Sequence, residues 1–163
     1  MNTLVLCTGN SARSIMLESL LNRLSNGRVT AYSAGSSPSG TVHPQSLFLL
    51  DSLGFDTDIL RSKNWGEFTT TDAPPMNLVI ALCGSAAGEP CPIWPGTPLR
   101  AHWGVEDPAS TDQADWEVAF QTVFDQLKRR ALAFLDQPFE TMHPPALTTA
   151  LNKIGALSCI QDC

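Results

Sequence analysis

A cysteine and an arginine with five residues between them form a segment near the start of the chain that suits oxyanion chemistry. The segment contains, in order, Cys7, Thr8, Gly9, Asn10, Ser11, Ala12, Arg13 and Ser14. Small residues let successive backbone N–H groups converge on one anion, and the positive end of a following helix adds to them. Arg13 can then hold two oxygens of a tetrahedral oxyanion with its planar guanidinium.

The same N–H groups are also expected to change the acidity of the Cys7 thiol. We expect them to lower the pKa of the Cys7 thiol, so that it is a thiolate nucleophile at neutral pH, with Ser14 as a hydrogen-bond donor to the sulfur. The alternative is a buried strand cysteine, followed by a simple turn at Gly9 and Asn10.

A second pair of cysteines, Cys83 and Cys91, flanks seven small or turn-forming residues at 84–90. Such a loop allows its two ends to meet, as a Cys83–Cys91 disulfide requires. From the residues alone, a redox pair and a core cysteine with an incidental loop cysteine are equally good interpretations.

Asp107 follows a predicted strand and precedes Pro108, which restrains the loop. A carboxyl group in that place suits a general acid beside an oxyanion site. Asp-Pro is also a common turn dipeptide, and taken alone that interpretation is preferred.

The elements that must position these residues alternate between strands and helices. Apolar runs predict strands at residues 3–8, 28–33, 77–83 and 99–103. Apolar residues at helical spacing predict helices over residues 16–24, 44–54 and 113–135, and a last one after Pro144 and Pro145. This alternation predicts an α/β fold with a parallel sheet and right-handed crossovers. Ligands bind beyond the C-terminal ends of such strands, where Cys7 and Cys83 both fall.

Composition, net charge and the length of apolar runs argue against some classes of function. The 163 residues are 43% hydrophobic and 16% charged, so we expect one domain over residues 1–163, with 158–163 as a flexible tail. The net charge of −6 argues against nucleic-acid binding. The longest apolar run, 78–83, is far shorter than the ~20 residues that cross a bilayer, and the first residues lack signal-peptide features. We therefore expect a cytoplasmic protein that does not bind membranes.

Together these segments resemble the arsenate reductases built on the low-molecular-weight tyrosine phosphatase fold and recycled by thioredoxin-type reductants. The resemblance spans at least residues 4–109. It is carried by residues 7–14, the run Tyr32-Ser33-Ala34-Gly35, residues 82–92 and residues 102–109. It implies a four-stranded parallel sheet with helices on both faces.

The resemblance also implies a thiol relay. Cys7 attacks the arsenic of arsenate held by the loop and Arg13, and Asp107 protonates the departing oxygen. Cys83 then attacks the adduct, which releases arsenite and leaves a Cys7–Cys83 disulfide. Cys91 moves the disulfide to Cys83–Cys91, where thioredoxin, a glutaredoxin with glutathione, or a mycothiol system reduces it. No bound cofactor is implied.

The chain departs from the family at a cation site. Some relatives bind potassium beside the loop through residues that correspond here to Asn10, Glu18 and Ser33, with an aspartate at the position of Trp65. Because that aspartate is missing, we predict no potassium site and expect Lys63 to supply positive charge nearby.

The remaining cysteines suggest no metal site. The chain has no C-x-x-C pair and no histidine at zinc-finger spacing, so we predict no zinc. Cys159 and Cys163 lie in the terminal segment, outside the shared pattern. We interpret them as incidental thiols of a frayed terminus, with a secondary redox or metalloid-binding pair as the alternative.

Two other functions stay open. A phosphotyrosine phosphatase uses the same loop and Asp107 but needs neither Cys83 nor Cys91. Such phosphatases usually carry an aromatic residue after the Asp-Pro pair, and Ala109 stands there instead, which favours the reductase. A non-catalytic sensor of oxyanions or metalloids would use the loop without the relay.

Overall fold

The structure is a computed structural model that describes residues 1–84 and 92–157. In this part of the chain, four parallel strands form one sheet in the order β2-β1-β3-β4. The strands are β1 (Asn2–Leu6), β2 (Thr30–Ala34), β3 (Leu78–Ala81) and β4 (Leu99–His102). The predicted four-stranded parallel α/β fold is confirmed.

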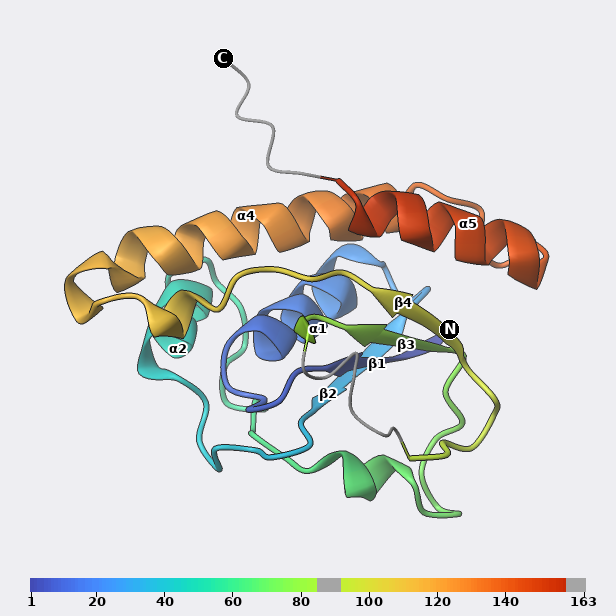
Figure 1. Cartoon of the computed structure of the whole chain (residues 1–163), viewed down its shortest axis with the longest axis horizontal. Helices are drawn as coiled ribbons and strands as arrows, with labels where there is room; N and C mark the ends of the chain where they lie inside the picture. The colour runs from blue at the N-terminus through green and yellow to red at the C-terminus, as the bar shows by residue number, and fades with distance from the viewer. Residues whose placement is uncertain (85–91, 158–163) are drawn as a thin grey trace.

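Helices follow the strands as the apolar spacing predicted. They are α1 (Arg13–Leu24), α2 (Pro44–Ser52), α4 (Trp116–Leu135) and α5 (Pro144–Gly155). Figure 1 shows α1, α4 and α5 on one side of the sheet, and the short 3₁₀ helix η1 (Trp65–Phe68) on the other. Among the described residues, α-helices therefore cover one face of the sheet, and a 3₁₀ helix lies on the other.

The alternation of side chains along the strands divides the core between these two faces. Val5 and Ile80 pack toward the helices, whereas Leu4 and Val79 pack on the side of η1. Trp103, just after β4, is fully buried, and its Nε1 donates to the carbonyl of Leu151 in α5 at 3.1 Å. These contacts fix the strand ends from which the loops of the site leave.

The differences from the sequence prediction lie at element boundaries. The first helix begins at Arg13 instead of near Met16, because the loop after β1 runs directly into it. The 3₁₀ helices η1, η2 (Pro108–Ser110) and η3 (Gln113–Asp115) were not predicted, since such short turns carry no apolar period. Of the helices described, none is both long and apolar enough to cross a membrane.

Candidate active site

The loop that joins β1 to α1 is held from its outer side. The carbonyls of Thr8, Gly9 and Ser11 all accept hydrogen bonds from neighbouring segments. The donors are Ser37 N (3.0 Å), Ser39 N (3.0 Å), Ser62 Oγ (3.2 Å), His43 N (2.9 Å) and Ser46 Oγ (3.1 Å). Because a peptide N–H points opposite to the carbonyl of the same peptide plane, these bonds turn loop N–H groups away from the outer segments.

On its inner side the loop encloses a small pocket of about 60 Å³. The residues that line it are Cys7, Gly9, Asn10, Ser11, Ala12, Arg13, Asp107 and Ala109. Inward N–H groups, a guanidinium and the start of α1 make this pocket suited to a small oxyanion. The loop is thus prearranged by bonds that an anion does not have to supply.

A glycine allows the loop to lie against the end of β2. A Cβ on Gly35 would come within 2.3 Å of the Thr8 carbonyl oxygen and 2.8 Å of the Cys7 carbonyl oxygen. The backbone of Gly35 also pairs with the segment before η1, since its N–H donates to the Lys63 carbonyl at 2.9 Å. Only a residue without a side chain fits between these two pieces of backbone.

Asn10 links the loop to its surroundings. It is fully buried, with φ +44° in the left-handed region that asparagine tolerates better than most residues. Its Nδ2 donates to Ser14 Oγ at 2.8 Å, and its Oδ1 accepts from the Lys63 N–H at 2.9 Å. The Asn10 bond leaves the hydroxyl proton of Ser14 for another acceptor.

Cys7 and Cys83 come together where adjacent strands end. Cys7 follows β1, Cys83 lies just beyond β3, and both are buried thiols that pack with Ala81. The sulfur of Cys83 is also 3.4 Å from Thr8 Oγ1. The two cysteines predicted to share one edge of the sheet therefore lie side by side.

The prediction that the Cys7 thiol has a lowered pKa was wrong. A hydrogen bond with Cys83, followed by burial, raises the pKa of the Cys7 thiol far above its ordinary value. Arg13 and the Gly9 N–H act in the lowering direction that we predicted, but they are outweighed. The spacing of residues 7–13 could not reveal that a second sulfur contacts Cys7.

Arg13 and Asp107 meet at the mouth of the pocket. Arg13 Nη2 lies 3.5 Å from Asp107 Oδ2, and Arg13 Nη1 donates to the Val105 carbonyl at 3.2 Å. Asp107 also caps η2, because its Oδ1 accepts from the Ala109 N–H at 3.1 Å. The predicted acid therefore reaches the loop from β4, with its side chain 44% exposed.

Sequence reasoning missed the residue that holds the beginning of the Asp107 segment. Arg130 of α4 is 3% exposed, and its Nη1 donates to the carbonyls of Trp103 (2.8 Å) and Gly104 (3.1 Å). An arginine on an amphipathic helix ordinarily lies in solvent, so the pattern gave no signal of this contact.

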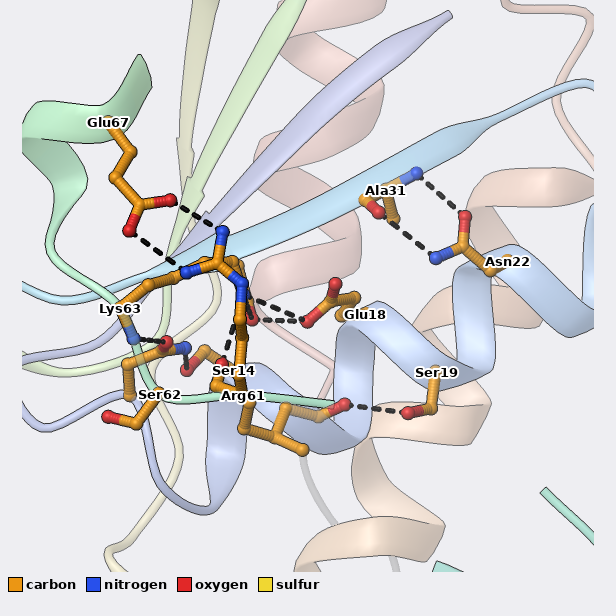
Figure 2. A network of polar contacts seen from close by, with 12 residues as sticks. Ser14, Glu18, Ser19, Asn22, Ala31, Arg61, Ser62, Lys63 and Glu67 are labelled. Atoms are coloured by element: carbon orange, nitrogen blue, oxygen red, sulfur yellow. Dashed lines mark hydrogen bonds and ion pairs between the residues drawn. The ribbon is translucent and has the colours of Figure 1, made fainter. Parts of the chain in front are cut away.

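The residues compared with a potassium site gather around Lys63. Lys63 Nζ lies 3.1 Å from the Arg61 carbonyl oxygen, 3.5 Å from Ser33 Oγ and 3.9 Å from Glu18 Oε2. Figure 2 shows Lys63 and Glu18 approaching each other from separate segments. Because an ammonium already lies among these oxygens, and Trp65 packs with the apolar cluster around Trp94, the set does not fit potassium.

Burial disfavours the charged forms of both Glu18 and Lys63. It raises the pKa of Glu18 and lowers that of Lys63, while each group acts on the other in the opposite direction. Ser33 Oγ also donates a hydrogen bond to Glu18 Oε2, which favours the carboxylate.

Three cysteines for which the sequence suggested a redox role lie outside the described residues. Cys91 lies in 85–91, outside the described residues, and so do Cys159 and Cys163 in 158–163.

A parallel sheet whose first strand ends in a cysteine, an anion loop and an arginine defines a phosphatase-like oxyanion site. The family model described as "Low molecular weight phosphotyrosine protein phosphatase" matches residues 2–143, and the chain belongs to this family.

Within the family, the chain is similar to proteins named arsenate reductase. One from Halalkalibacterium halodurans is 35% identical over 134 residues, which cover 80% of this chain and 92% of that protein. One from Bacillus subtilis is 34% identical over 134 residues, with the same coverage of both chains.

Solved structures give the same picture. An arsenate reductase in the phosphate binding state matches with a TM-score of 0.66 and 28% identity, covering 82% of this chain and 95% of that one. The thioredoxin-dependent arsenate reductase of Corynebacterium glutamicum matches with a TM-score of 0.57 and 25% identity, covering 80% of this chain and 58% of that one.

Proposed function

We propose that this protein reduces arsenate to arsenite through a relay of three cysteines, recycled by a thioredoxin-type reductant. The observation that carries the proposal is the buried thiol of Cys83 beside Cys7, at the end of the neighbouring strand. Hydrolysis of a phosphate ester needs one nucleophilic sulfur, whereas reduction of arsenic needs two electrons, which two thiols supply.

The first step is nucleophilic attack by Cys7 on arsenate in the pocket. The loop N–H groups and Arg13 hold three oxygens of the anion, and Asp107 gives a proton to the fourth. A sulfur–arsenic bond forms, an arsenic–oxygen bond breaks, and water leaves. The Cys7 thiolate forms on arsenate binding through transfer of its proton to a basic oxygen of the anion.

The second step transfers the electrons. Cys83 attacks the sulfur of Cys7, a disulfide forms, and the electron pair of the broken sulfur–arsenic bond passes to arsenic. Arsenic(V) becomes arsenic(III) and leaves as arsenite. The contact between Cys7 and Cys83 supports this step, because in-line attack requires one sulfur to reach the other.

The third step recycles the nucleophile. Cys91 attacks Cys83, which restores the Cys7 thiol and moves the disulfide to Cys83–Cys91. A dithiol reductant of the thioredoxin type, or a glutaredoxin with glutathione, then reduces that disulfide. The reaction belongs in the cytoplasm, where such reductants keep thiols reduced.

The test is arsenate-dependent consumption of NADPH with thioredoxin and its reductase, repeated with glutaredoxin and glutathione. We expect turnover with at least one system and none without arsenate, together with at most weak hydrolysis of an aryl phosphate. Efficient hydrolysis without arsenate reduction would assign the phosphatase activity instead. Binding of oxyanions without either reaction would assign a sensor.

A further inference from the structure

We propose that the ammonium of Lys63 is a built-in cation that positions the oxyanion loop, so that Lys63 is a positioning residue for the site. The proposal depends on the proposed function only for its activity readout. Its other readout, binding of inorganic phosphate, needs only the anion pocket.

The side chain of Lys63 joins two elements beneath the loop. Its Nζ lies near Glu18 on α1 and Ser33 on β2, and the Ser33 hydroxyl bonds the same carboxylate oxygen of Glu18. Lys63 is 8% exposed, and this is an uncommon place for a lysine. Burial of its charge is costly unless the surrounding oxygens hold it, so the cluster fixes the ammonium at one point.

The main chain of Lys63 extends the same link to the loop. Its N–H donates to Asn10 Oδ1 at 2.9 Å, and its carbonyl accepts from the Gly35 N–H at 2.9 Å. Asn10 in turn donates to Ser14 Oγ at 2.8 Å. One residue therefore ties α1 and β2 to the strained residue of the anion loop.

The neighbouring cation does not duplicate this role. Arg61 has a side chain 60% exposed, and its guanidinium bonds Glu67 with both amino groups, at 2.9 and 2.6 Å. Figure 2 shows Arg61 paired with Glu67, whereas the ammonium of Lys63 lies 3.9 Å from Glu18. Lys63 is thus the lysine whose charge is placed among the oxygens beneath the loop.

A fixed cation here has a consequence for binding. If it only balances Glu18, removal of both charges together restores the site. If it positions the loop, removal of both charges restores stability but leaves oxyanion binding weak. The pair Lys63 and Glu18 therefore separates a structural role from a positioning role.

The experiment compares Lys63→Met, the double variant Lys63→Met/Glu18→Gln, and Lys153→Met as the control on an exposed lysine of α5. Each intact chain is assayed for thermal unfolding, for calorimetric binding of inorganic phosphate, and for kcat and KM with arsenate. We expect the double variant to unfold near the wild-type temperature, yet to bind phosphate about tenfold more weakly and to show a raised KM for arsenate. This is the scale seen when a group that orients binding residues is lost. Lys153→Met should match the wild type.

Chemical rescue provides the second arm. Lys63→Ala leaves room for a small ammonium ion among the same oxygens, so methylammonium chloride should restore phosphate binding, and tetramethylammonium chloride should not. Wild-type phosphate affinity in the double variant, or equal effects of the two salts, would overturn the proposal. If wild-type protein binds phosphate but does not reduce arsenate, the proposed function fails while this test still stands.

Discussion

The guanidinium of Arg13 holds Asp107 at 3.5 Å through Nη2, and through Nη1 it holds the Val105 carbonyl two residues earlier. The guanidinium that faces the anion pocket therefore also holds the Asp107 segment, although 94 positions separate Arg13 and Asp107 in the sequence (107 − 13). An oxyanion held by Arg13 would therefore lie next to Asp107, the proton donor of the proposed mechanism.

This relationship predicts the effect of removing the acid. Asp107→Asn should slow the formation of the Cys7–Cys83 disulfide in a single turnover by about 10²- to 10⁴-fold, the usual contribution of a general acid. Phosphate affinity should remain, because Arg13 and the loop are unchanged. Asp107→Ala should slow the same step and also weaken η2, whose cap it removes. Glu106→Gln, at the exposed neighbouring position, is the control. An unchanged single-turnover rate would limit Asp107 to its capping role.

Replacement of the nucleophile should stop every reaction of the pocket. Cys7→Ser should abolish arsenate reduction and any hydrolysis of aryl phosphate, because an unactivated hydroxyl is a much weaker nucleophile than a thiolate. Phosphate titration should still detect the pocket, which shows that the variant is folded. Turnover at the wild-type rate would remove Cys7 from the mechanism.

Variants of Cys83 and Cys91 should stop the reaction at different steps. Cys83→Ser should block the release of arsenite, while Cys91→Ser should allow one turnover and then accumulate the Cys7–Cys83 disulfide. Peptide mapping after one equivalent of arsenate, with remaining thiols blocked, identifies the trapped bond. Both variants should keep any phosphatase activity of the wild type. Multiple turnovers by Cys83→Ser would contradict the relay.

The raised pKa of Cys7 predicts a specific pH dependence. A thiol whose pKa is raised becomes a thiolate only at alkaline pH, so alkylation of wild-type Cys7 by iodoacetamide should be slow at neutral pH. Cys83→Ala removes the largest cause of the shift, and the pKa of Cys7 should fall. Its alkylation at pH 7, followed by mass spectrometry of the Cys7 peptide, should become faster. Cys159→Ala, which removes a thiol of the terminal segment 158–163, serves as control. A slower reaction in Cys83→Ala would show that Cys83 activates Cys7 instead.

The close approach at Gly35 predicts a stability effect. Gly35→Ala places a methyl group 2.3 Å from the Thr8 carbonyl oxygen, so the loop or β2 must shift. We expect a loss of about 1–3 kcal/mol in the free energy of unfolding, with weaker phosphate binding. Gly84→Ala is the control for stability measured by urea unfolding, because no atom of the described residues lies within 4 Å of its added methyl group. Equal stability of the two variants would show that the backbone adapts freely.

Local patterns were enough to predict the framework. The apolar runs at 77–83 and 99–103 contain β3 and β4, and the small residues after Cys7 form the loop that the pattern indicated. A parallel sheet then brings its strand ends to one edge, which is why the meeting of Cys7 and Cys83 could be predicted.

The features that the sequence did not predict depend on contacts between residues that are far apart along the chain. Lys63 reaches Asn10 across 53 positions, and nothing near either residue encodes that bond. Arg130 is buried against carbonyls although its helix is amphipathic. The direction of the Cys7 pKa shift depends on a balance between Cys83, burial and Arg13, which spacing along the chain does not contain.

The outward hydrogen bonds of the anion loop have a consequence for how the substrate is chosen. A cradle of backbone N–H groups, fixed in advance, offers the same donors to phosphate as to arsenate, since both are tetrahedral oxyanions of similar charge. Discrimination therefore falls to the reaction that follows binding. Arsenic(V) accepts an electron pair from a thiol adduct and phosphorus(V) does not, so a phosphate ion that enters leaves unchanged. Selectivity in such a site is chemical, and we expect abundant phosphate to compete with arsenate for the pocket without consuming the thiols.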